Sequence, residues 1–142
     1  MPTDIHALFA LLEEKQLRYV VVGGLALVLH GVDRLTADVD LAVDLSPEAA
    51  GQLVEALAEA GYRPAAPVMQ VFSYWDTTGR RPTIDIFIAS PIPFGDLWRD
   101  TLRVEISSGL RVPVAPVAHL IRLKELAGRP QDLADIERLR EL

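Results

Sequence analysis

Two pairs of residues in the first third of the chain have the types and spacing for phosphate and metal chemistry. Gly23 and Gly24 directly follow an apolar run, and Asp38 and Asp40 are alternate residues of a second apolar run. Successive side chains of a β-strand point to opposite faces, so both carboxylates would leave the same face, roughly 7 Å apart. Carboxylates so placed can bind divalent cations together with a phosphate chain. The glycines offer backbone N–H groups to a phosphate without a side chain in the way.

A third carboxylate interrupts a later apolar run. Asp85 lies within TIDIFIA, which otherwise has the composition of a buried strand. A buried acid without a partner costs several kcal/mol or shifts its pKa until it is neutral. A metal ion shared with Asp38 and Asp40 would meet this need. The alternative, a salt bridge to Arg80 or Arg81, is less favoured because both arginines lie in a turn.

This ordered set resembles the signature of the nucleotidyltransferase superfamily, which has the DNA polymerase beta-like fold. The signature is a glycine pair opening a helix, an Asp-x-Asp on a strand, and an acid on a later strand. Small standalone members include antibiotic nucleotidyltransferases and the AbiEii/MNT-type proteins of toxin–antitoxin systems. The resemblance implies transfer of a nucleoside monophosphate from an NTP such as ATP to a hydroxyl acceptor. It also implies two Mg²⁺ ions, with Mn²⁺ as an alternative, held by Asp38, Asp40 and Asp85.

The resemblance also implies individual roles. Gly23 and Gly24 would receive the β- and γ-phosphates. Asp85 would bind the acceptor-side metal and help to deprotonate the incoming hydroxyl. The pair reads Gly-Gly rather than the Gly-Ser of many members, which removes one hydroxyl that could hold a phosphate.

Two cations are candidates to offset the charge of the leaving pyrophosphate. Arg34 belongs to an Arg-x-Thr-x-Asp-x-Asp arrangement that is frequent in the family, and Lys124 lies on a helix that resembles one in small members. For Arg34 the alternatives are an ion pair with Asp38 or Asp40, or a solvated position in a loop. For Lys124 the alternative is a surface position without a role in binding.

The elements that must position these residues are apolar strands interspersed with helices. Strands are predicted at residues 18–22, in the aspartate-bearing apolar run that ends with VDLAVDL at residue 45, at 68–74 and at 82–89, with an extended segment at 62–67 and a hairpin within 103–115. Helices are predicted at residues 3–16, capped by Thr3 or Asp4, at 24–30 and at 46–60. Ser46 and Pro47 form a typical helix start. The pattern and the resemblance together predict an α/β (α+β) nucleotidyltransferase fold, in which a mixed central β-sheet is flanked by helices.

The last part of the chain is predicted to be a helical pair within about residues 116–142, broken at 128–130. This segment resembles the end of small nucleotidyltransferases, which often consists of a Lys-bearing helix, a Gly-Arg-Pro-like break and an acid-rich helix. Asp132 and Asp135 match that last helix. Their ordinary explanation is that acids in a first helical turn stabilise the helix N-terminus.

Composition limits the class of protein. Half of the 142 residues are hydrophobic and 24% are charged, which predicts one globular domain over residues 1–142. The absence of cysteine excludes disulfides and thiolate metal sites. No signal peptide and no membrane-length apolar run is evident, so we expect a cytoplasmic protein without a membrane partner. The formal net charge of −6 argues against non-specific nucleic-acid binding, which needs basic surface.

Other kinds of site lack their signatures. The 3 histidines are scattered without metal-ligand spacing. Neither a Gly-x-Ser-x-Gly elbow nor the Gly-Lys-Ser/Thr of a P-loop is present. Tyr74, Trp75 and Trp98 could stack a nucleobase, although aromatic residues in strands and turns more often lie in the core or at its rim.

Two functional hypotheses follow. The first is an active enzyme that uses an NTP and an acceptor hydroxyl on a small molecule, a protein or a tRNA end. No appended substrate domain is evident, so a homodimer or a protein partner is a candidate to complete the acceptor site. The second is a non-catalytic or weakly active, antitoxin-like interaction module of a toxin–antitoxin pair. We favour the enzyme because all three aspartates are present.

Overall fold

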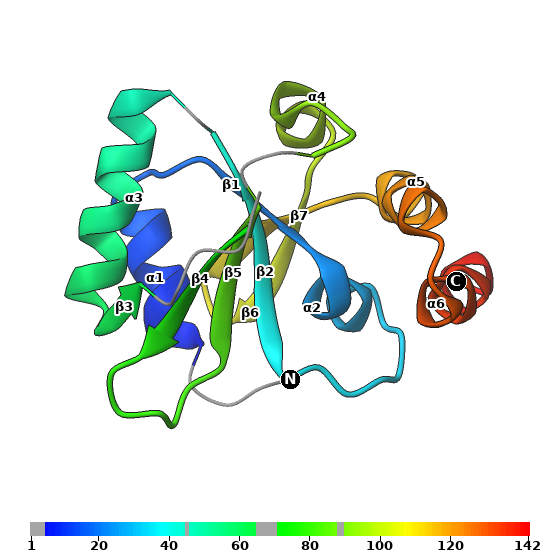
Figure 1. The fold of residues 1–142 in the computed structure, drawn as a ribbon, viewed down its shortest axis with the longest axis horizontal. Coiled ribbons are helices and arrows are strands. Elements are labelled where there is room, and N and C mark those ends of the chain that lie inside the picture. The colour runs from blue at the N-terminus through cyan, green and yellow to red at the C-terminus, as the bar shows by residue number, and fades with distance from the viewer. Residues whose placement is uncertain (1–4, 45, 65–70, 88–89) are drawn as a thin grey trace.

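The computed structural model describes residues 5–44, 46–64, 71–87 and 90–142, which form a mixed β-sheet between two sets of helices (Figure 1). The strands are β1 (Tyr19–Val22), β2 (Asp38–Val43), β3 (Tyr62–Pro64), β4 (Val71–Asp76), β5 (Thr83–Phe87), β6 (Leu102–Ser107) and β7 (Leu110–Val114). In the described part of the chain, the seven-stranded sheet has the order β3-β4-β5-β2-β1-β7-β6. β2 pairs antiparallel with β1 and parallel with β5. The predicted mixed sheet is confirmed.

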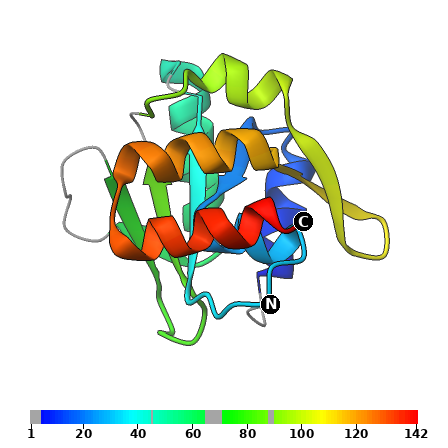
Figure 2. The ribbon, with the colours of Figure 1, turned by 90° about the vertical axis from the view of Figure 1, so that its right-hand side faces the viewer.

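The helices lie on both faces of this sheet. They are α1 (His6–Glu14), α2 (Gly23–Leu29), α3 (Pro47–Glu59), α4 (Phe94–Arg99), α5 (Val117–Ala127) and α6 (Pro130–Arg140). α1 and α3 cover one face, whereas α2, α5 and α6 lie on the other (Figure 1). Figure 2 shows α5 and α6 side by side in front of the sheet, as the predicted C-terminal pair.

Local sequence accounts for the central elements. All four residues of β1 are buried, as expected for an apolar run that is covered on both faces of a sheet. Ser46 caps α3 by accepting a hydrogen bond from the N–H of Ala49 (3.3 Å), and Pro47 follows at the first helical position. α5 ends at Gly128, whose φ of 65° is left-handed, and Pro130 opens α6. The predicted start of α3 and the predicted break between α5 and α6 are confirmed.

Several boundaries differ from the prediction. α2 begins at Gly23, one residue early. β4 extends to Asp76, which is buried and accepts hydrogen bonds from the backbone N–H groups of Arg80 and Arg81. The strand therefore ends two residues later than predicted. The predicted cap at Thr3 or Asp4, the extended residues 65–67, and the strand residues 68–70 and 88–89 lie outside the described part.

The C-terminal helices contribute both to the core and to a surface that faces the sheet. Leu120, Ile136 and Leu139 are buried in the core. Leu123 is only partly buried and packs against that core. In the described part of the chain, no helix combines the length and the apolar composition needed to cross a membrane.

Candidate active site

Strand register brings the three aspartates and the glycine pair together. Asp40 of β2 lies opposite Asp85 of β5 and opposite Val22 of β1. Since Gly23 follows Val22 directly, the glycine turn begins beside the Asp40 carboxylate. A Cβ atom at Gly23 would overlap that carboxylate, and the φ of Gly23 is +65°. Only glycine allows the backbone to approach Asp40 so closely in this conformation.

The space next to Gly24 is also taken. A Cβ atom there would lie 2.9 Å from Oγ1 of Thr36 and 3.5 Å from Cζ of Arg34. A serine at this position would therefore require Thr36 to shift. Many family members have a serine hydroxyl at this position, which the Gly-Gly pair lacks. Thr36 places a hydroxyl close by, and its Oγ1 donates to the backbone oxygen of Asp38 (3.2 Å).

Burial and like charge act together on Asp40. Desolvation is the larger cause, and with the nearby charges of Asp85 and Asp38 it raises the pKa of Asp40 to about 7. Lys124 opposes this change. Asp38 is more exposed, and its pKa is raised by partial burial and by the charge of Asp85. Near neutral pH the cluster therefore holds a proton that a bound cation would displace.

Asp85 has a hydroxyl partner, and Arg81 pairs with a different acid. Ser73 of β4 donates a hydrogen bond from Oγ to Oδ1 of Asp85 (2.5 Å). Arg81 instead binds Asp76, with Nη2 at 2.7 Å from Oδ1, and donates to the backbone oxygen of Ala60. The turn after β4 thus brings Arg81 to the carboxylate of Asp76, five residues before it.

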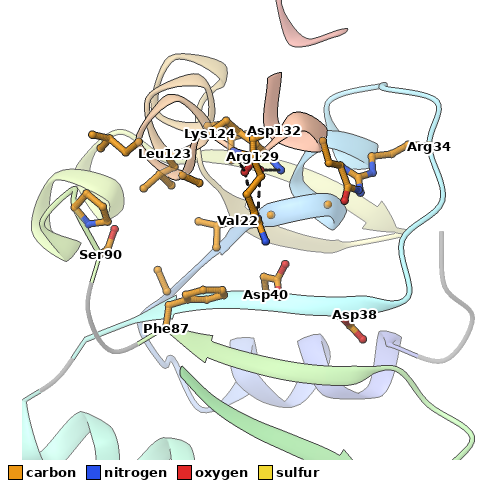
Figure 3. Close-up of a pocket in the computed structure, with 18 residues that line it drawn as sticks. Val22, Arg34, Asp38, Asp40, Phe87, Ser90, Leu123, Lys124, Arg129 and Asp132 are labelled. Carbon is orange, nitrogen blue, oxygen red and sulfur yellow. Dashed lines mark hydrogen bonds and ion pairs between the residues drawn. The ribbon is translucent and has the colours of Figure 1, made fainter. Parts of the chain in front are cut away.

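A cavity of about 580 Å³ lies between the aspartates and the C-terminal helices (Figure 3). Six predicted site residues line it: Gly23, Gly24, Arg34, Asp38, Asp40 and Lys124. The remaining one, Asp85, lies beside Asp40 in the next strand. One end of the cavity is polar and contains Arg34 and Asp38 (Figure 3). The other end is mostly apolar and contains Phe87 and Leu123. Such a cavity suits a ligand with one charged and one apolar part.

The two predicted cations are not solvated. Lys124 donates from Nζ to Asp135 (2.8 Å) and Asp132 (3.3 Å), and Nη1 of Arg34 lies 2.6 Å from Oδ2 of Asp135. Each cationic side chain is only 13% exposed. The solvated alternatives for Arg34 and Lys124 are therefore wrong, and Arg34 is paired with an acid of α6 instead of with Asp38 or Asp40.

Asp132 has the structural role expected of an acid in a first helical turn. Its Oδ2 accepts the backbone N–H of Arg129 (3.1 Å) in a capping box at the start of α6. It also pairs with the side chains of Arg129 (2.7 Å) and Lys124. Burial alone would raise the pKa of Asp132, but the hydrogen bonds from Arg129 and Lys124 outweigh it and hold the pKa below its usual range.

Nearly the whole chain matches the model of one protein family. Residues 3–140 match the family model "Nucleotidyltransferase of unknown function (DUF6036)". The chain belongs to this family. No curated protein sequence matches the chain.

Solved structures of nucleotidyltransferases share the fold. ANT(2")-Ia in complex with adenylyl-2"-tobramycin superposes with a TM-score of 0.67 and 16% identity, over 95% of this chain and 84% of that chain. The lincomycin-bound lincosamide antibiotic adenylyltransferase LnuA superposes with a TM-score of 0.69 and 17% identity, over 99% of this chain and 98% of that chain. At such identities the likeness establishes the nucleotidyltransferase fold alone.

Sequence reasoning missed part of the cavity of this nucleotidyltransferase. Arg129 and Phe87 line it, whereas the aromatic candidates lie elsewhere: Trp98 stacks on Phe94, and Trp75 lies under Arg63. A signal for Phe87 was available, because it is two residues after Asp85 and so shares its face of the strand. Arg129 carried no such signal, since its position depends on how α6 packs on α5.

The aspartates fit divalent cations in their chemistry. Carboxylate oxygens are the ligands that Mg²⁺ prefers, and Asp40 is an enclosed acid next to two like charges. Within residues 5–44, 46–64, 71–87 and 90–142, no group of three or more His, Cys, Asp or Glu side chains is gathered tightly enough to hold a metal ion by itself. Phosphate oxygens or water would have to complete the coordination, as is usual for Mg²⁺.

Proposed function

We propose that this chain transfers a nucleoside monophosphate from an NTP to a hydroxyl acceptor, with two Mg²⁺ ions, or Mn²⁺, bound by Asp38, Asp40 and Asp85. The observation that carries the proposal is the approach of the glycine turn to Asp40 inside a cavity that Lys124 and Arg34 also line. That arrangement leaves room for phosphates between backbone N–H groups, carboxylates and positively charged side chains.

The two ends of the cavity suggest how an NTP would bind. The triphosphate would lie along Gly23 and Gly24, within reach of Lys124 and Arg34. The nucleoside would occupy the apolar end, where Phe87 offers a ring for stacking. Holding both ends of the nucleotide fixes the α-phosphorus over the aspartates, and such positioning is the main contribution of a protein to phosphoryl transfer.

In the transfer step, the acceptor oxygen bonds to the α-phosphorus as the bond to pyrophosphate breaks. Asp85 takes the hydroxyl proton, and Ser73 fixes the orientation of its carboxylate through the 2.5 Å hydrogen bond. Lys124 and Arg34 offset the negative charge that develops on pyrophosphate. Bound Mg²⁺ ions would lower the pKa of the acceptor hydroxyl and neutralise phosphate charge.

The similar structures favour ATP and a small-molecule acceptor. One contains adenylyl-2"-tobramycin, and the other is an adenylyltransferase with lincomycin bound. We propose that residues 1–142 act as one catalytic domain in the cytoplasm, and that a second copy or a protein partner completes the acceptor site.

One observation favours the second hypothesis, a weakly active, antitoxin-like module. Lys124 and Arg34 are already paired with acids of α6, which reduces the positive charge available to a triphosphate. The two hypotheses differ in whether the cavity binds nucleotide at all.

Thermal unfolding in the presence of each NTP and Mg²⁺ tests the enzyme hypothesis. A ligand at a hundredfold excess over its Kd stabilises the folded state by about 2.7 kcal/mol. We expect the wild type to gain several degrees, and Asp40→Asn to gain nothing relative to its own midpoint without ligand. If no NTP shifts the wild type, the enzyme hypothesis is wrong and the interaction module is the better account.

A further inference from the structure

Two acids on α6 are almost fully buried. Asp132 is 1% exposed and Asp135 is 3% exposed. Buried carboxylates are costly unless they are paired, and burying an ion pair rarely adds stability over apolar residues of similar size. Asp132 has a structural reason in the capping box of α6, whereas a reason other than stability is needed for Asp135.

Asp135 joins three separate segments. It accepts from Lys124 of α5 at 2.8 Å and from Arg34, in the loop between α2 and β2, at 2.6 Å. Arg34 is 101 residues away in sequence. Both cations line the cavity that contains Asp40, whereas Asp135 itself does not. Asp135 thus contacts both cations without itself lining the cavity.

Both cations keep N–H groups for a ligand. A lysine ammonium has three donors, and Lys124 directs two of them to Asp132 and Asp135. An arginine has five donors, and Arg34 directs Nη1 to Asp135 and Nε to the backbone oxygen of Leu35. The guanidinium also lies against the glycine turn, since its Cζ is 3.5 Å from where a Cβ of Gly24 would be.

We propose that Asp135 is a positioning residue for polyphosphate binding: it fixes Lys124 and Arg34 so that their remaining donors face the phosphates of an NTP. This inference rests on the proposed function. Side chains fixed in advance lose less entropy when a ligand binds, and both lysine and arginine have much to lose. Asp135 therefore strengthens the binding of an anion although it is itself negative.

The two explanations of Asp135, by charge alone or by positioning, predict opposite changes in the affinity for an anion. If Asp135 acted only through its charge, Asp135→Asn would strengthen the binding of an anion. If it positions the two cations, Asp135→Asn weakens binding. Glu137→Gln is the matched control, because it removes one negative charge from an exposed position on the same helix.

The probe is inorganic triphosphate with Mg²⁺, titrated calorimetrically into wild type and variants. We expect Asp135→Asn to weaken binding roughly tenfold and Glu137→Gln to leave it nearly unchanged. In an Arg34→Gln background the effect of Asp135→Asn should be clearly smaller, because one of the two positioned cations is gone. Asp135→Glu keeps the charge but moves the carboxylate by one methylene, and should also weaken binding.

The outcomes separate this inference from the proposed function. Binding by the wild type establishes the phosphate site, and the variants then test positioning alone. Equal or tighter binding by Asp135→Asn, or full additivity with Arg34→Gln, would overturn the positioning role. Should Asp135→Asn fail to fold, unchanged binding by Asp135→Glu would overturn it equally. No binding by the wild type would overturn both proposals.

Discussion

Replacing Asp40 with Asn should stabilise the protein while removing the proposed activity. The pKa of Asp40 rises from 3.8 to about 7 in the folded protein. Each tenfold change in proton affinity corresponds to about 1.4 kcal/mol, so ionising Asp40 at pH 8 costs the folded state up to about 4 kcal/mol. Asn has nearly the same shape, carries no charge and can donate a hydrogen bond to Asp85 as a protonated Asp40 would.

The gain in stability should depend on pH in a defined way. Between about pH 4 and pH 7 the folded wild type keeps a proton on Asp40 that the unfolded chain has released, so its free energy of unfolding falls as the pH rises. Asp40→Asn has no such proton. The difference between the two proteins should therefore widen over this range and become constant above about pH 8.

Denaturant unfolding at pH 5 and pH 8 measures this difference. At pH 8 we expect Asp40→Asn to be about 1 to 4 kcal/mol more stable, which corresponds to roughly 4 °C in the melting midpoint for each kcal/mol. Asp38→Asn is the control, since Asp38 is more exposed and should give a smaller gain. A variant no more stable than wild type at pH 8, or a gain that is the same at both pH values, would refute the reasoning.

Three further predictions concern the same cavity. Gly23→Ala should lower the free energy of unfolding by more than about 1 kcal/mol in a denaturant titration, because the φ of Gly23 is +65° and an added Cβ would overlap Asp40. The control is Gly51→Ala, inside α3 with open space around the residue, which should be neutral or stabilising. Phe87→Ala should weaken ATP binding by about 1 to 3 kcal/mol in calorimetry and leave inorganic triphosphate binding unchanged, and an equal loss for both probes would contradict a stacking role. Mg²⁺ affinity, measured by titration at several pH values, should rise as the pH passes about 7, because Asp40 must release its proton, and a flat profile would show that it does not.

The sequence predicted the aspartate cluster because its signals are local. Alternation along a strand placed Asp38 and Asp40 on one face, and the apolar runs around them identified the strands. Their different environments did not follow from alternation. Asp40 is enclosed because it pairs with Val22 at the end of β1, whereas Asp38 extends beyond that end and is exposed. A difference of two positions in register decides which carboxylate has the larger change in pKa.

The partners of Arg34 and Lys124 could not be predicted in the same way. The Arg34–Asp135 ion pair joins residues 101 positions apart, and no periodic pattern specifies contacts at such a separation. The turn after β4 is a contrasting case. Asp76 accepts backbone N–H groups four and five residues ahead of it, which is local hydrogen bonding of a kind that Asp favours in turns. The pairing of Arg81 with Asp76 was therefore within reach of sequence reasoning.

The distribution of charge around the cavity suggests why the C-terminal helices are part of this domain. The strands supply the aspartates, and α5 supplies Lys124, held by acids of α6. Asp40 and Lys124 are close enough for the lysine to oppose the rise in the pKa of Asp40. An NTP with its cations would lie between these two walls, with cations against the strands and phosphates against the helices. Binding would thus join α5 and α6 more firmly to the sheet, and hydrogen exchange should slow in both helices when nucleotide binds.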